Sequence, residues 1–146
     1  MNTDPIVAQQ TLNAPVDVVW RAITEPDQMR QWYFDSIADF KAEPGFQTEF
    51  NVHFEGVDYL HQWRVTEVEP RCRIVYDFKF AGIEVEYSYV VWELEETPGG
   101  TKLTLTNEGN HNLPRDNSVF SREAGQAGWD YFVCQGLPAY LSRQNS

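Results

Sequence analysis

The chain has 146 residues, 22 of them acidic and 11 basic, so its formal net charge is −11 at pH 7. This length predicts one domain, spanning residues 1–146, that is large enough to bury a core. Because basic residues do not form a run, we expect neither nucleic acid nor an anionic membrane as a partner.

The two cysteines, Cys72 and Cys134, are too few for a disulfide framework, and we expect both to be free thiols. Residues 1–20 lack the basic and apolar regions of a signal peptide. No apolar run reaches the roughly 20 residues of a membrane span. The sequence therefore predicts a cytoplasmic protein without a membrane-spanning segment.

The first quarter of the chain predicts one strand followed by two short helices. Residues 5–12 are typical of a strand, and Pro15 suits the first position of a helix. The apolar face of that helix has the spacing i, i+3, i+4, i+7 and consists of Val16, Val19, Trp20 and Ile23. A second helix is expected to begin near Pro26 and to bury Met29, Trp32 and Tyr33.

Residues 36–107 predict antiparallel strands throughout, because apolar and polar residues alternate between turn sequences. The expected strands are 36–40, 46–54, 59–69, 72–80, 84–95 and 101–107. Gly99-Gly100 is interpreted as a hairpin turn before the last strand.

A long helix is predicted over residues 118–141, capped by Asn117 or Ser118. We expect Pro138 to kink it, because proline lacks a backbone donor. Gly128 is expected to let the helix approach the sheet closely, with Trp129 as a structural residue that does not contact a ligand. The expected inward face consists of Phe120, Ala124, Ala127, Tyr131, Cys134 and Leu141.

This order of elements predicts an α+β fold in which a curved antiparallel sheet wraps around a long C-terminal helix. The chain also contains a series of short sequence motifs that are distributed along most of its length. They are Ala14-Pro15, Trp20, Ala22–Thr24, Pro26, Trp32, Val65, Glu67–Pro70, Ile74–Tyr76, Gly99–Leu105, Gly128-Trp129 and Tyr140-Leu141.

With these motifs the chain resembles the START-like superfamily, also called SRPBCC, which has the helix-grip fold. Within it, the chain is similar to the group of the activator of the ninety-kilodalton heat-shock protein ATPase. It departs from the group at Pro44-Gly45, where a Gly-Gly pair is frequent, and by one extra residue between Trp129 and Tyr140. The resemblance implies a cavity between helix and sheet, and it implies no universal catalytic residues.

We therefore expect a small hydrophobic or amphipathic ligand to bind between the sheet and the last helix. Inward-facing positions of the strands and helices supply the candidate ligand-binding residues. They are Trp32, Phe50, Tyr59, His61, Trp63, Tyr76, Phe78, Trp92, Phe120, Ala124 and Tyr131. Val52, Val65, Val90, Leu103 and Leu105 are expected to face inward with them. The alternative is that these side chains fill a solid core.

His61 is the candidate for polar chemistry, because a neutral imidazole can orient a ligand or act as a base. The three histidines and two cysteines show no metal-ligand spacing, and we expect neither metal nor cofactor. Two alternative functions remain open at this point. One is an enzyme of the same fold (a cyclase, dehydratase or hydrolase) that uses His, Glu or Tyr groups in the pocket. Glu84 and Glu86 could reach the pocket rim, but we expect them at a solvated strand end. The other is a chaperone cofactor or other protein-interaction module, with a homodimer or partner on an outer sheet face formed by Tyr87, Tyr89 and Val91.

Overall fold

The computed structural model describes residues 4–113 and 120–144. The helices are α1 (Val16–Thr24), α2 (Pro26–Trp32), α3 (Arg122–Tyr131) and α4 (Leu137–Gln144), and a π-helical segment (Phe132–Gly136) joins the last two. A 3-10 turn follows the last strand at Asn110–Asn112. The strands are β1 (Ile6–Leu12), β2 (Gln47–Phe54), β3 (Val57–Glu69), β4 (Arg73–Asp77), β5 (Lys79–Phe80), β6 (Tyr89–Thr97) and β7 (Gly100–Glu108).

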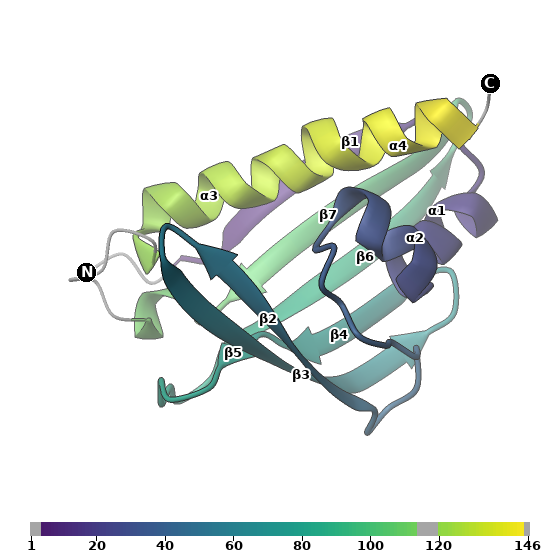
Figure 1. The fold of residues 1–146 in the computed structure, drawn as a ribbon. Helices are drawn as coiled ribbons and strands as arrows, with labels where there is room; N and C mark the ends of the chain where they lie inside the picture. The colour runs from purple at the N-terminus through teal and green to yellow at the C-terminus, as the bar shows by residue number, and fades with distance from the viewer. Residues whose placement is uncertain (1–3, 114–119, 145–146) are drawn as a thin grey trace.

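The strands form a curled antiparallel sheet in the order β1-β7-β6-β4-β3-β2. Strand β3 pairs with β2 along one edge, and its other edge is shared between two partners. That edge pairs with β4 through Val65–Glu69 and with β5 through His61 and Gln62. The C-terminal helix runs across the sheet, with β1 behind it and the β2–β3 hairpin in front (Figure 1). This arrangement is the helix-grip fold, and the predicted α+β class is confirmed.

The interior follows the alternation of side chains along the strands. On β7, Leu103 and Leu105 are fully buried while their neighbours are partly exposed. The helical stripe that faces them consists of Trp129, Val133, Leu137, Tyr140 and Leu141. The expected inward orientation of Val65, Val90, Leu103 and Leu105 is therefore confirmed.

One half of the interior is a solid cluster of aromatic rings. Tyr76 lies at its centre, where its Oη accepts a hydrogen bond from Trp92 Nε1 at 3.0 Å and lies 3.1 Å from Tyr33 Oη. Burial raises the pKa of both tyrosines, so both hydroxyls stay protonated. Trp63 packs against Tyr76 with the two rings tilted by 35° and their centroids 4.6 Å apart.

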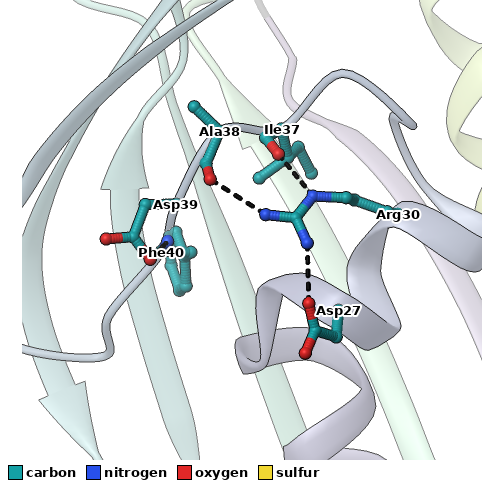
Figure 2. Close-up of polar contacts among 6 residues, drawn as sticks. All are labelled: Asp27, Arg30, Ile37, Ala38, Asp39 and Phe40. Atoms are coloured by element: carbon teal, nitrogen blue, oxygen red, sulfur yellow. Dashed lines mark hydrogen bonds and ion pairs between the residues drawn. The ribbon is translucent and has the colours of Figure 1, made fainter.

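Residues 36–40 form a loop, so the predicted strand there is wrong. The Arg30 guanidinium donates hydrogen bonds to Ile37 O at 2.6 Å and to Ala38 O at 2.9 Å (Figure 2). These two carbonyls are therefore not available for pairing with a neighbouring strand. The same guanidinium is held by Asp27 at 2.7 Å. Hydrogen bonds from a side chain of α2 thus stand where strand pairing was expected. Phe40, at the end of the loop, is buried in the core.

Two other predicted strands are shorter than expected. The strand predicted over 72–80 is interrupted at Phe78, whose backbone N–H donates to Ser88 O at 2.9 Å. The strand predicted over 84–95 begins only at Tyr89, so Glu84 and Glu86 lie in a loop. Val91 is buried and Tyr89 half-buried, which leaves Tyr87 as the exposed member of the expected outer patch.

The last helix differs from its prediction in where it starts, in which face is buried and in the effect of Pro138. Ala127, predicted to face inward, is exposed, because the buried stripe passes through Trp129 and Val133 instead. The α3 helix begins at Arg122 with Ser121 as the cap, whose Oγ accepts from Ala124 N at 3.1 Å. The expected caps, Asn117 and Ser118, lie outside the described residues. Pro138 produces no break, because a π-helical turn precedes it and absorbs one extra residue.

Side chains of the last helix hold the free edge of β1. Gln126 Nε2 donates to Val7 O at 2.9 Å, and Cys134 Sγ lies 3.4 Å from Gln9 O. Arg122 donates to the backbone carbonyls of Asp4 and Pro5. These contacts occupy edge carbonyls that would otherwise be available to another strand.

Gly100 is the glycine on which the β1–β7 pairing depends. Its φ is +150°, and a Cβ there would overlap the carbonyl oxygen of Leu12. We expect Gly100→Ala to lower the free energy of unfolding by about 3 kcal/mol through backbone strain and overlap. The matched control is Gly99→Ala, where a Cβ meets nothing within 4 Å. Urea unfolding of both variants checks this, and equal stabilities would contradict it.

Candidate functional site

A cavity of about 350 Å³ lies between the β2–β3 hairpin, β5 and the first turns of the C-terminal helix. The strand side of its wall consists of Val52, Phe54, Tyr59, His61, Phe78 and Phe80. The helix side consists of Phe120, Ala124, Gly125, Gly128, Trp129 and Phe132. Phe34, Ser88, Asn107, Asn110 and Leu113 complete it. The wall is therefore mainly aromatic, with polar groups at a few points, as is typical of small-molecule sites.

Two glycines of α3 have different roles at this wall. A Cβ on Gly128 would meet nothing within 4 Å, so its missing side chain adds to the free volume. A Cβ on Gly125 would lie 3.0 Å from Ile6 Cδ1, so this glycine permits the close packing of helix on sheet. The prediction that Gly128 permits close packing of the helix on the sheet is therefore wrong, because Gly125, about one helical turn earlier, has this role.

His61 lies on β3 with 4% of its surface exposed and is surrounded by Phe34, Phe50, Phe78 and Phe80. Its Nδ1 lies 3.0 Å from Tyr59 O. Because a carbonyl only accepts, Nδ1 carries the proton and Nε2 is left as an acceptor. Burial lowers the pKa of His61 to about 4, so the ring is neutral at pH 7. Nε2 has no hydrogen-bond partner among residues 4–113 and 120–144.

A second polar region of the wall is formed by Ser88 and Asn107. Ser88 is 1% exposed, and its Oγ has no hydrogen-bond partner within the described part of the chain. Asn107 Nδ2 donates to Tyr89 O at 3.2 Å, and its Oδ1 accepts from Trp129 Nε1 at 3.3 Å. Asn107 thereby fixes the Trp129 ring. Trp129 is buried, as its expected structural role requires, and its ring also lines the cavity.

The structure divides the predicted site residues into three groups. Five lie on the cavity wall: Tyr59, His61, Phe78, Phe120 and Ala124. Five others are buried away from it, mostly in the solid aromatic half of the interior: Trp32, Phe50, Trp63, Tyr76 and Trp92. Tyr131 is 55% exposed, so its predicted inward orientation is wrong. Tyr131 lies two residues from Trp129, about 200° around the helix, and Trp129 takes the inward position.

Several wall residues were absent from the prediction. Phe54 and Phe80 continue the alternation of Phe50 and Phe78, so the pattern contained a signal for them. Phe132 and Trp129 follow from the correct helix face. Phe34 and Ser88 lie in connecting segments, where no periodicity indicates which way a side chain points.

The described wall carries no carboxylate, lysine or arginine. Within residues 4–113 and 120–144 no three His, Cys, Asp or Glu side chains gather as a metal-binding group. None of the helices in the same residues is long and apolar enough to cross a membrane. The chemistry that the described wall offers is therefore apolar contact plus hydrogen bonding.

A helix-grip fold with an apolar cavity under its long helix defines the START-like, or SRPBCC, class of protein. The sequence profile of the family described as "Activator of Hsp90 ATPase homolog 1-like protein" matches residues 13–142. The chain belongs to this family, as the resemblance implied.

Solved structures of similar fold support the assignment. Protein MLL2253 of Mesorhizobium loti is 26% identical with a TM-score of 0.76, and the match covers 95% of this chain and 97% of that one. DynU16, from the dynemicin biosynthetic locus, is 26% identical with a TM-score of 0.74, over 97% of this chain and 48% of its own. CV1439 of Chromobacterium violaceum shares the fold at 22% identity, with a TM-score of 0.77 over 93% and 95% of the two chains. No curated protein matches with significant sequence similarity.

The burial of neutral His61 predicts a dependence of stability on pH. The unfolded chain binds a proton at His61 near pH 6.5, whereas the folded protein does so only near pH 4. The stability is complete above pH 6.5 and falls as the pH drops toward 4. Between pH 7 and pH 5 the protonation of this residue is expected to lower the free energy of unfolding by about 2 kcal/mol.

The variant His61→Gln provides the control, because glutamine does not titrate. Urea unfolding at pH 7 and pH 5 gives the free energy of unfolding of both proteins. The natural protein is expected to lose about 2 kcal/mol more than the variant over this interval. Equal losses would show that His61 is not buried as a neutral ring.

Proposed function

We propose that this protein binds a small, uncharged hydrophobic or amphipathic molecule in the cavity. The observation that carries the proposal is an aromatic wall with two polar atoms that have no hydrogen-bond partner among the described residues. One is the buried Ser88 Oγ, and the other is His61 Nε2. Polar groups in a protein interior are normally hydrogen-bonded. A polar group of a ligand would supply the hydrogen bond that these two side chains lack.

The absence of charge from the described wall favours a neutral ligand. An ionised carboxylate or amine that enters an apolar cavity loses its hydration and requires an opposite charge to compensate. The rings of Phe78, Phe80 and Trp129 instead offer edge and face contacts to a flat or elongated apolar body. The similarity to DynU16, a protein of a biosynthetic locus, is in line with a small-molecule ligand.

The state of His61 favours binding over catalysis. A ring with a pKa of about 4 is not an imidazolium at pH 7, so it cannot serve as a general acid, and it is a weak base. No hydrogen bond joins His61 to the Ser88 hydroxyl in the described residues, so the nucleophile–base pair of an acyl-transfer site is missing there. A neutral acceptor of this kind orients a ligand donor.

Binding is tested with N-phenyl-1-naphthylamine, a neutral fluorescent probe that carries one N–H donor. The natural protein is expected to bind it with a stoichiometry of one. In Gly128→Leu the new side chain enters the free volume, and we expect at least a tenfold loss of probe affinity with the fold intact. Fluorescence titration measures affinity, and a thermal melt measures stability.

Gly128→Ala is the matched control for the same position. Its single methyl group leaves most of the cavity open, so probe binding is expected to persist. Both substitutions are expected to stabilise α3 by up to about 1 kcal/mol, because glycine is a poor helix former. If Gly128→Leu melts at or above the natural temperature and still binds the probe, the cavity is not the binding site.

The enzyme alternative is tested by a turnover screen over ester, thioester and polyketide-like substrates. We expect no turnover by the natural protein or by His61→Gln, and a modest loss of probe affinity in the variant. Turnover by the natural protein that disappears in His61→Gln would replace the binding proposal with an enzymatic one.

A further inference from the structure

The exposure of side chains changes steadily along the inner face of the β2–β3 hairpin. On β3 it falls from 49% at Val57 through a partly exposed Tyr59 to 4% at His61. On β2 it falls from 50% at Phe54 through Val52 to 3% at Phe50. Because Phe54 and Val57 are paired across the strands, two half-exposed apolar side chains lie at the same end. Phe54 lines the cavity, and Val57 is its cross-strand neighbour just outside the lining residues, so the hairpin runs from the buried interior to the rim of the cavity.

The tip of this hairpin extends beyond the rest of the sheet. Strand β5 pairs with β3 only at His61 and Gln62, and the tip residues pair only with each other in the described ladders. The tip lies beside the start of α3 (Figure 1). Tyr59 and Phe120, whose rings are 5.6 Å apart, form the contact between them.

We propose that Phe54 and Val57 form the outer part of the ligand site, an inference that rests on the proposed function. The ligand is then elongated: a hydrogen-bond donor at its buried end meets His61 Nε2, and an apolar tail lies against the hairpin tip. His61 and Val57 are four residues apart on one strand, a separation of about 13 Å. This distance matches a hydroxylated ring that carries a tail of several methylenes.

The opposite face of the same hairpin supplies the control. Leu60 is 37% exposed and lies on β3 between Tyr59 and His61, so its side chain points to the other face of the strand. Removing an exposed apolar side chain there changes the hairpin in the same chemical way without touching the proposed site.

The test uses 4-ethylphenol and 4-hexylphenol, two neutral phenols that differ only in tail length. Isothermal titration calorimetry measures their affinities for the natural protein, Phe54→Ser, Val57→Ser and Leu60→Ser. In the natural protein each methylene that reaches the rim is expected to raise affinity about fourfold. Phe54→Ser and Val57→Ser should each weaken 4-hexylphenol at least fivefold and leave 4-ethylphenol within twofold. Leu60→Ser should leave both within twofold.

The short phenol reports whether each variant has kept its fold and inner site. Equal weakening of both phenols by the rim variants, unchanged binding of 4-hexylphenol, or equal weakening of it by Leu60→Ser would each overturn the proposal. If neither phenol binds but N-phenyl-1-naphthylamine does, the elongated-ligand proposal fails and cavity binding stands. If the naphthylamine also fails to bind, the proposed function fails with it.

Discussion

The sharing of one edge of β3 between two partners is the constraint on which the rest of the structure depends. The C-terminal part of this strand pairs with β4 and its middle, at His61 and Gln62, pairs with β5, and the change occurs where the Phe78 backbone turns toward Ser88. On the β4 side the sheet is continuous, and Trp63, Tyr76 and Trp92 fill the space beneath the helix. On the β5 side, the cavity lies between the hairpin and the first turns of the C-terminal helix. The solid core and the cavity are thus two results of one change in strand pairing.

This division explains which parts of the molecule the sequence predicts. Alternation along β2, β3 and β7 identifies the inner face, because period two leaves only two possible faces. This alternation does not indicate how far the sheet lies from the helix. Trp63 and His61 therefore have the same sequence pattern, although Trp63 is in the core and His61 is on the cavity wall. That difference depends on long-range pairing. The loop over 36–40 could not be predicted either, because its backbone partners belong to the Arg30 side chain.

The last helix shows a different kind of limit. Its apolar residues support two faces, one through Tyr131 and one through Trp129, and propensity does not choose between them. In the structure Trp129 is the inward residue, and its indole donates a hydrogen bond to Asn107 Oδ1 inside the protein. The π-helical turn then shifts the following residues, so that Leu137 and Tyr140 remain inward despite the extra residue. A strict helical period predicts neither effect.

The contacts between the helix and the β1 edge give the cavity one fixed wall. Arg122, Gln126 and Cys134 hold successive backbone carbonyls of the N-terminal strand and its approach, so the helix cannot slide along the sheet without breaking several contacts at once. The facing wall is a two-stranded ribbon, which is a compliant structure in water. The site is therefore mechanically asymmetric. If the cavity binds ligands as proposed, adaptation to ligands of different thickness would occur by bending of the ribbon, with the helix as the rigid reference.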